Sequence, residues 1–385
     1  MRICAHGSHA PEVLSISSSI GSQPSLGRFS PNLIITFTGP NPSVGCVIVN
    51  DKHVVGRGWT QPGGRPHAES EALRRANSKA HGATAYITLE PCAHHGRTPP
   101  CTDALIKAGI ARAVIAMEDP DERVSGLGIK ILKKAGIDVT CGVGGIEAQK
   151  INRGFILREE FNRPLVTLKV ATSIDGRIAT VSGHSKWVTG DLARARAHML
   201  RATHDAILVG SGTVFADDPS LTCRLSGLES RSPVRIIMDG RLRISLKQKV
   251  LKTASEVPTW IVTESGTDAS KKELFEAAGV NIIEVKRDNT GNLDISMTLK
   301  ALGKLGITRV LVEGGAQISA AFFKARLIDH ISIFRGPMVI GGDGLPFTQP
   351  FLVTKLDNAP TFNRELLCEL DNDIFEHFVS SDWST

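Results

Sequence analysis

Short apolar runs alternate with helix-forming segments from Val44 onward, and this alternation restricts the fold more than any other feature of the sequence. In the first part of the chain we expect strands at residues 44–49, 85–89, 113–117 and 137–140, with helices at residues 66–80, 102–108 and 128–135. Strands that alternate with helices of this length are typical of α/β layers in which most neighbouring strands run parallel. The sequence therefore predicts an α/β fold with a largely parallel sheet.

A second alternating pattern begins after Pro164 and indicates a second domain. Here we expect strands at residues 166–171, 206–209, 234–238, 259–262, 310–312 and 331–334, with helices at residues 192–202 and from Gly315 to about residue 325. The length of 385 residues also favours two domains, because one domain commonly has roughly 100–200 residues. The expected organisation is an atypical segment at residues 1–38, a first domain at 39–148, a linker at 149–163 and a second domain at 164–385.

Composition narrows the class of protein. No apolar run approaches the ~18 residues of a transmembrane helix, so we expect no membrane association. The net charge of +6 is small for this length and the basic residues are not clustered, which argues against a nucleic-acid partner. Seven cysteines, an odd number spread over the chain, argue against a disulfide framework and for a reducing compartment. We therefore expect a cytoplasmic protein.

The first 38 residues differ from the rest, because they are rich in Ser, Gly and Pro and show no clear helical period. A disordered or poorly specified N-terminus explains this composition. The segment is also poor in acidic residues, as organelle transit peptides are, although Arg2 and Arg28 are its only arginines. We favour the first of these two interpretations.

Three residues with metal-binding side chains follow the pattern of a catalytic zinc site: His67, Cys92 and Cys101. A catalytic zinc takes three protein ligands and keeps a fourth position for a water, whose pKa it lowers. Glu69 lies two residues after His67, at the start of an expected helix, where it can transfer protons without binding the metal. The tripeptide His-Ala-Glu alone occurs by chance in many helices, but its combination with Pro91-Cys92 and Cys101 is typical of zinc nucleobase deaminases. We expect one Zn²⁺ per chain.

Residues 39–148 resemble the deaminase domain of the bifunctional deaminase/reductase family of riboflavin biosynthesis, which has a cytidine-deaminase-like α/β/α fold. The resemblance rests on the string PNPSVGCVIV at residues 40–49, on the zinc motif, and on the eight residues that separate Cys92 from Cys101. Nucleic-acid deaminases usually have only two residues between these cysteines. The resemblance implies that Asn41, His94 and His95 line the pyrimidine pocket, although an ordinary solvated turn would also explain His95.

Residues from Pro164 to about Asp382 resemble the partner reductase of the same family, which has a dihydrofolate-reductase-like α/β fold. The matching stretches are residues 168–177, 185–189, 212–222, 312–315 and 341–344. Among them, Glu313-Gly314-Gly315 follows an expected strand and opens an expected helix, where bare backbone N–H groups bind phosphate well. Two glycines alone are also typical of a plain turn, and the full glycine pattern of a Rossmann domain is absent.

The same resemblance implies two sets of ligand contacts. It implies that NADPH contacts Ala171, Trp187, Thr213, Asp217, Gly240, Gly315, Ala316 and Gln317. It implies that the phosphoribosyl substrate contacts Ser185, Arg201, Leu221, Arg224 and Glu313. Arg201 and Arg224 suit a phosphate because a guanidinium group binds phosphate in a bidentate manner. Asp217 and Lys169 both remain candidates for handling the proton of the reduction.

The expected function is that of a bifunctional enzyme acting on small phosphoribosyl pyrimidines. The first step would deaminate 2,5-diamino-6-(5-phosphoribosylamino)pyrimidin-4(3H)-one to 5-amino-6-(5-phosphoribosylamino)uracil, and the second would reduce the ribosyl group to ribityl with NADPH. A homo-oligomer is left open.

Two alternatives are a nucleic-acid-editing zinc deaminase with an unrelated C-terminal domain, and a degraded paralogue with a weakened deaminase. The second arises because residues 28–37 contain Pro31 where the family normally has an amphipathic helix, and proline breaks a helix interior.

Overall fold

The computed structural model describes residues 38–94, 99–121 and 125–383. The chain divides into two compact units between Glu160 and Phe161. This division falls within the segment 149–163, where the sequence predicts a linker. The expectations for residues 1–37 and for His95 lie outside the described residues.

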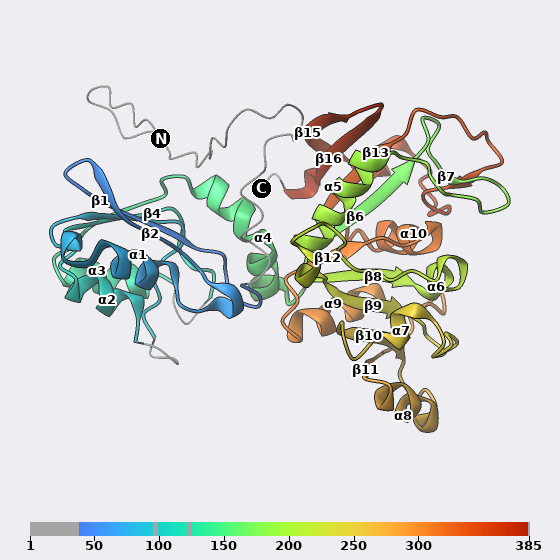
Figure 1. Ribbon diagram of the computed structural model, residues 1–385, viewed down its shortest axis with the longest axis horizontal. Coiled ribbons are helices and arrows are strands. Elements are labelled where there is room, and N and C mark those ends of the chain that lie inside the picture. Colours follow the sequence, from blue (N-terminus) through green and yellow to red (C-terminus); the bar gives the residue numbers. More distant parts are fainter. Residues whose placement is uncertain (1–37, 95–98, 122–124, 384–385) are drawn as a thin grey trace. The chain divides into compact units, whose positions relative to one another are not determined.

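The first unit contains one mixed sheet whose strand order is β2-β1-β3-β4-β5 (Figure 1). Its strands are β1 (Gly45–Asn50), β2 (His53–Trp59), β3 (Thr84–Ile87), β4 (Arg112–Ile115) and β5 (Asp138–Cys141). Its helices are α1 (Ala68–Ala76), α2 (Cys101–Lys107), α3 (Leu127–Lys134) and α4 (Gly145–Phe161). The three strands β3, β4 and β5 pair in parallel, whereas β1 pairs antiparallel with both β2 and β3. The expected strands and helices of this unit are therefore confirmed, and β2 is an addition to them.

Strand β2 escapes a sequence-based assignment because it carries two glycines, which weaken strand propensity. A Cβ atom at Gly56 would collide with the backbone of Ala72, and one at Gly58 would collide with the backbone of Ala68. The glycines thus let α1 lie directly against the sheet, and Ala68, Ala72 and Ala76 are all buried in that contact. This close packing fixes the helix that follows His67.

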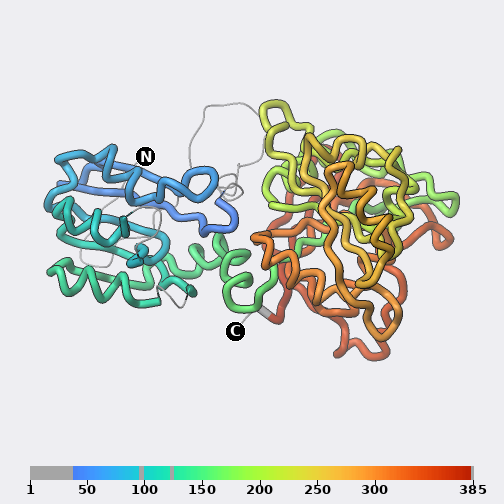
Figure 2. Tube along the Cα trace, turned by 90° about the horizontal axis from the view of Figure 1, so that it is seen from below, coloured from blue at the N-terminus to red at the C-terminus, as the bar shows by residue number. Residues whose placement is uncertain are grey.

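The second unit is built on a nine-stranded sheet of order β11-β10-β9-β8-β12-β6-β13-β16-β15. The strands are β6 (Leu165–Thr172), β8 (Ala206–Gly210), β9 (Val234–Met238), β10 (Thr259–Glu264), β11 (Val280–Val285), β12 (Arg309–Val312), β13 (His330–Arg335), β15 (Phe362–Leu370) and β16 (Asp373–Ser380). Pairing is parallel from β11 to β13 and antiparallel from β13 to β15. Figure 2 follows the chain by colour and shows β6, in green, in the same unit as the orange and red C-terminal segments.

The helices of this unit are α5 (Asp191–Ala202), α6 (Ser211–Asp217), α7 (Lys249–Lys252), α8 (Ala269–Ala277), α9 (Ile295–Lys304) and α10 (Ala316–Ala325), and a small sheet joins β7 (Arg177–Ala179) to β14 (Leu345–Pro346). The central strands read as continuous apolar runs because they are buried on both faces, and all five residues of β8 are buried. Of the helices in the described part of the chain, none combines the length and the apolarity that crossing a bilayer requires.

Candidate active sites

The structure brings His67, Cys92 and Cys101 together in the first unit. Their ligand atoms all lie within 4.8 Å of one another. The Nδ1 atom of His67 is 3.6 Å from the Sγ of Cys92 and 3.3 Å from the Sγ of Cys101. One imidazole and two thiols at these distances match the donor set that zinc prefers.

Backbone geometry places each of these ligands. His67 directly precedes α1, and Cys101 is the first residue of α2. Cys92 lies in the loop after β3, and its carbonyl oxygen accepts hydrogen bonds from the backbone N–H and the hydroxyl of Thr102, both at 3.3 Å. The backbone N–H of Cys101 points to the Cys92 sulfur at 3.3 Å. A thiolate is favoured at this position because the N-terminus of a helix carries partial positive charge.

The Cys101 thiol donates its proton in a hydrogen bond to the Cys92 sulfur. A hydrogen bond from Cys101 lowers the pKa of Cys92 to about 4, and the same contact raises the pKa of Cys101. A divalent cation would displace this proton and take both sulfurs as thiolates, because metal binding requires deprotonated ligands. The residues present therefore fit a zinc ion.

Glu69 is buried beside this cluster, as the second residue of α1. Burial raises its pKa from an ordinary 4.5 to about 7, because the low-dielectric interior disfavours the carboxylate. A carboxyl group with a pKa near neutrality can both accept and release a proton. The proton-transfer role of Glu69 remains a prediction, with which its burial and its pKa agree.

The expected pyrimidine contacts are only partly described. The Nδ2 group of Asn41 donates to the Thr38 carbonyl at 3.0 Å, and the Asn41 side chain packs so closely on Gly64 that a Cβ there would collide with it. Gly64 lies three residues before His67 in the sequence. His94 is exposed in the loop after Cys92. Their contacts with a pyrimidine remain a prediction.

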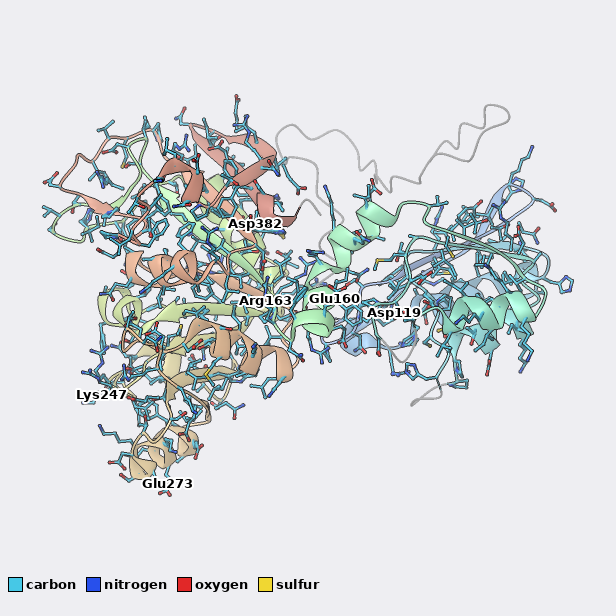
Figure 3. The ribbon with its side chains drawn as sticks, turned by 180° about the vertical axis from the view of Figure 1, so that it is seen from behind. Asp119, Glu160, Arg163, Lys247, Glu273 and Asp382 are labelled. Carbon is cyan, nitrogen blue, oxygen red and sulfur yellow. The ribbon has the colours of Figure 1, made fainter. Side chains whose placement is uncertain are left out.

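Two buried carboxyl groups of the first unit were not identified from the sequence. Glu90, which directly precedes Pro91-Cys92, accepts three backbone hydrogen bonds. Asp119 is also buried, and Figure 3 labels it within the first unit. Burial raises the pKa of Asp119 to about 7. The position of Glu90 beside a metal ligand was the one available signal, because neither residue belongs to a metal or catalytic motif.

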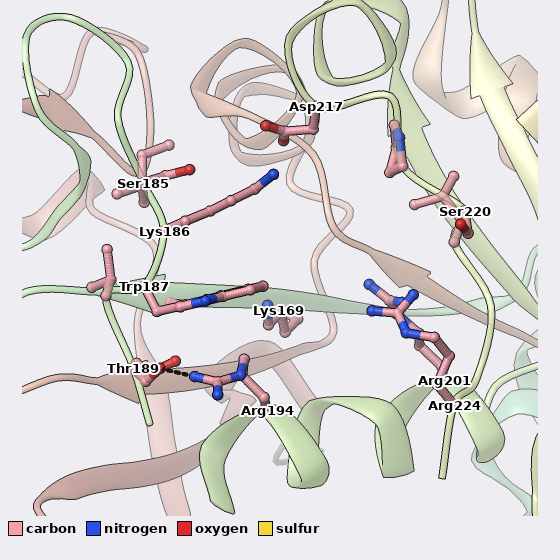
Figure 4. A pocket seen from close by; sticks show the side chains of 15 residues that line it. Lys169, Ser185, Lys186, Trp187, Thr189, Arg194, Arg201, Asp217, Ser220 and Arg224 are labelled. Carbon is pink, nitrogen blue, oxygen red and sulfur yellow. Dashed lines mark hydrogen bonds between the residues drawn. The ribbon is translucent and has the colours of Figure 1, made fainter. Parts of the chain in front are cut away.

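A cavity of about 350 Å³ lies in the second unit (Figure 4). Seven of the residues assigned to ligands by resemblance line it: Ala171, Ser185, Trp187, Arg201, Asp217, Leu221 and Arg224. Lys169 also lines the cavity, as do Lys186 and Arg194, which the sequence did not indicate. Five cations therefore face one space, and such a cavity suits a phosphorylated ligand.

The remaining assigned residues are not among those that line this cavity. Thr213 lies in α6 and Gly315 directly precedes α10, and a Cβ at Gly315 would be 3.9 Å from the Thr213 hydroxyl. Ala316 and Gln317 form the first turn of α10, whereas Gly240 follows β9 and faces Leu293. Thr213 and the start of α10 thus form one group, and Gly240 lies on a separate loop.

Glu313 does not line the cavity but pairs with two of the cations that do. Arg201 donates to both carboxylate oxygens of Glu313, at 2.8 and 2.9 Å, and the Lys169 ammonium is 3.8 Å away. Burial alone would raise the pKa of Glu313, but these two cations outweigh burial and lower it to about 2. Glu313 therefore stays ionised at neutral pH and neutralises part of the charge around the cavity.

Arg194 is a further cavity residue without a sequence signal. Its guanidinium lies 4.5 Å from the centre of the Trp187 ring and donates to the Thr189 carbonyl at 2.7 Å, drawn as a dashed line in Figure 4. The Trp187 side chain is 63% exposed, so burial does little to hold it. The cation–π contact with Arg194 therefore fixes one face of the indole.

These features define a zinc-deaminase-like unit joined to a second unit with a cation-lined cavity. Residues 34–117 match the cytidine and deoxycytidylate deaminase zinc-binding region, and residues 164–374 match the RibD C-terminal domain. The chain belongs to the RibD family of bifunctional deaminase/reductases of riboflavin biosynthesis.

Similar proteins cover both units. The riboflavin biosynthesis protein RibD of Escherichia coli K12 is 40% identical over 366 residues, which are 92% of this chain and 96% of that protein. Its counterpart in Aquifex aeolicus is 44% identical over 305 residues, 79% of this chain and 83% of that protein.

Solved structures of similar proteins also cover both units. Acinetobacter baumannii RibD, 37% identical, superposes with a TM-score of 0.82 over 91% of this chain and 95% of its own. The Thermotoga maritima deaminase/reductase is 34% identical and superposes with a TM-score of 0.76 over 89% of this chain and 93% of its own.

These matches confirm the predicted fold class, a cytidine-deaminase-like unit followed by a dihydrofolate-reductase-like unit. They also confirm the prediction of a bifunctional deaminase and reductase, and give no support to a nucleic-acid-editing deaminase or a degraded paralogue.

Proposed function

We propose that the chain deaminates the pyrimidine ring of a diaminopyrimidine phosphoriboside in its first unit, and reduces the ribosyl group of the product with NADPH in its second unit. The observation that carries this proposal is the pairing, in one chain, of the His67–Cys92–Cys101 cluster beside buried Glu69 with the cation-lined cavity around Trp187.

In the first unit, His67, Cys92 and Cys101 would hold the zinc ion, which lowers the pKa of a water when bound. Glu69 would accept a proton and release it to the leaving ammonia. Its burial and its pKa of about 7 support both roles, because the carboxyl can change its protonation state near neutral pH. Asn41 and His94 would orient the polar edge of the ring.

In the second unit, NADPH would supply the hydride, and the protein would orient the two reactants. Trp187 offers the ring face that does not contact Arg194. Thr213 and the first turn of α10, which begins after Gly315, would bind the cofactor phosphates through backbone N–H groups.

Among the cavity arginines, Arg224 is the better phosphate ligand. The structure gives its guanidinium no hydrogen bond or ion pair with the described residues, whereas Arg201 is committed to Glu313 and Thr222. Burial, together with the charges of Arg201 and Arg224, lowers the pKa of nearby His198 to about 4. His198 is therefore uncharged at neutral pH, so the arginines and not His198 provide the positive charge that attracts a phosphate.

We favour Lys169 over Asp217 for the proton of the reduction. Both line the cavity, but the Lys169 side chain is mostly buried and is held 3.8 Å from Glu313, while Asp217 is exposed. An ammonium group with a fixed position can donate a proton where the sugar oxygen becomes a hydroxyl.

The decisive experiment is turnover of the diaminopyrimidine phosphoriboside by the full chain, with and without NADPH, alongside the zinc content of protein purified without chelators. We expect about one zinc per chain, ammonia release without NADPH, and NADPH oxidation only after deamination. Metal-free protein that deaminates fully would refute the zinc assignment. Light scattering would test for a homo-oligomer and cell fractionation would test the cytoplasmic location, both of which remain predictions.

A further inference from the structure

The carboxylate of Glu90 is held in an unusual position for an ionisable group. It is 3% exposed, and within the described part of the chain its hydrogen bonds come from backbone N–H groups. Its Oε2 atom accepts from the backbone N–H groups of Asp119 at 3.2 Å and Gly126 at 2.9 Å, and its Oε1 atom accepts from that of Ile129 at 3.2 Å. The three backbone N–H groups replace the water that burial removes from this carboxyl group, so that both of its oxygens keep hydrogen-bond partners.

These three donors belong to the segment that leads into α3 and to its first turn, which starts at Leu127. The first turn of a helix carries free N–H groups and partial positive charge, both of which favour an anion. The main chain of Glu90 is fixed as well, because its N–H donates to the Met117 carbonyl at 3.0 Å. Glu90 is therefore anchored at its backbone and at its side chain.

This anchor lies immediately before a metal ligand. Pro91 follows Glu90 and fixes the backbone φ angle, so little freedom remains before Cys92. On the other side of Pro91, α3 approaches so closely that a Cβ at Gly128 would collide with the Pro91 carbonyl oxygen. The main chain at Cys92 is thus held on one side by Thr102, which donates to the Cys92 carbonyl, and on the other side by the Glu90 anchor.

We propose that Glu90 is a positioning residue for the metal cluster, which holds the Cys92 thiolate at its distance from His67 and Cys101. Groups behind the direct ligands commonly set metal affinity, and their replacement typically costs roughly 10–100-fold in binding. Glutamine at this position would keep the size but turn one acceptor into an N–H donor that faces backbone N–H groups. The proposal rests on the proposed zinc site, and the zinc content of the wild-type chain tests that site separately.

The experiment compares the full-length chain with Glu90→Gln, Glu90→Asp and the control Glu118→Gln. Glu118 is an exposed carboxylate next to Asp119 and makes none of these contacts. Zinc affinity is measured by competition with a chromophoric chelator. The geometry of the sulfur ligands is measured from the visible absorption of the Co²⁺-substituted protein, and the fold of residues 38–160 from hydrogen exchange.

We expect E118Q to match the wild type, E90D to bind zinc more weakly, and E90Q to bind it roughly 10–100-fold more weakly with an altered cobalt spectrum. Hydrogen exchange across β1, β3 and α1 should stay near that of the wild type. Equal zinc affinity in E90Q and the wild type would overturn the proposal. If E90Q does not fold, E90D decides: wild-type zinc affinity in E90D would make Glu90 a structural cap of α3 only. A wild-type chain without zinc would instead refute the proposed zinc site.

Discussion

The guanidinium of Arg201 donates two hydrogen bonds, of 2.8 and 2.9 Å, to the carboxylate of Glu313. Its third nitrogen, Nη1, donates to the Thr222 carbonyl at 2.9 Å. These contacts occupy three of the five N–H donors of Arg201 and leave two for a phosphate. Bidentate phosphate binding by a guanidinium group is therefore expected more of Arg224 than of Arg201. Arg201 lines the cavity and binds Glu313. This division of roles can be tested one residue at a time.

Replacing Arg224 by alanine should weaken binding of the phosphorylated substrate of the reductase. A charge-assisted hydrogen bond is worth about 1.5–3 kcal/mol, so KM should rise by roughly 10–100-fold while kcat changes little. The measurement is NADPH oxidation at varied concentrations of the deaminated phosphoriboside. Arg224→Lys, which keeps the charge, should recover part of the loss, and the dephosphorylated riboside should show no difference between variants. A kcat effect with unchanged KM would place Arg224 in the chemistry instead.

Replacing Glu313 by glutamine should destabilise the second unit and reduce its reductase activity. Removing one partner of a buried ion pair typically costs about 3–5 kcal/mol, because the remaining charge is left without compensation. Here Arg201 and Lys169 would both lose their counterion. The change in the free energy of unfolding is measured by urea denaturation, which is monitored through hydrogen exchange in residues 161–385. Glu264→Gln is the control, because its pair with Arg287 is partly exposed and ion pairs in contact with solvent contribute little to stability.

The second unit should also lose stability in mild acid through His204. This imidazole is buried between the Leu200 carbonyl at 2.7 Å and the Thr167 hydroxyl at 2.9 Å. Burial lowers its pKa from 6.5 to about 3, so the folded state holds it neutral. The unfolded chain binds a proton first as the pH falls below about 6.5, so this contribution is complete above that pH and is lost progressively toward pH 3.

The test is the free energy of unfolding of the second unit at pH 7.5 and pH 5.0, for the wild type and for His204→Gln. Glutamine can donate to Leu200 and accept from Thr167, but it does not titrate. Its pH dependence should therefore be shallower by about 1.4 kcal/mol for each pH unit over which only the unfolded imidazole is protonated. His184→Gln is the control, because His184 is exposed. An unchanged slope in H204Q would show that other groups, such as His198, whose pKa is also lowered, dominate the acid response.

Sequence reasoning located the parts of this protein that depend on local patterns. The strands β8, β9 and β12 contain continuous, buried apolar runs, so they could be assigned without knowing which strands they pair with. The cluster of candidate metal ligands could be predicted from the types and spacing of His67, Cys92 and Cys101. The antiparallel strand β2 did not follow, because its glycines serve a contact with α1 that is made in three dimensions.

The missed site residues share the same cause. Glu90 matters through amide groups of α3, and Arg194 matters through a stacking contact with Trp187, so neither role belongs to a local motif. Arg201 shows the complementary limit. Its residue type suited phosphate, but the partner that occupies it, Glu313, lies 112 residues further along the chain.

The two reactions should separate in a single variant, Glu69→Gln. Glutamine keeps the shape of the side chain and all three metal ligands, but it cannot transfer a proton. General acid–base help is typically worth about 10²–10⁴-fold, so ammonia release from the diaminopyrimidine phosphoriboside should fall by at least that order. Zinc content should hold at the wild-type level, because Glu69 is not among the clustered ligand residues.

The same variant carries its own control in the second unit. Residues 161–385 form a separate compact unit with the cavity around Trp187, so NADPH oxidation with the deaminated uracil intermediate should match the wild type. With the diamino substrate, NADPH oxidation should nearly vanish, because no intermediate forms. Glu71→Gln is a matched second control, since Glu71 lies on the same helix and pairs with Arg74. Loss of zinc in E69Q would make Glu69 a ligand, and loss of reduction of the intermediate would show that the two active sites are coupled.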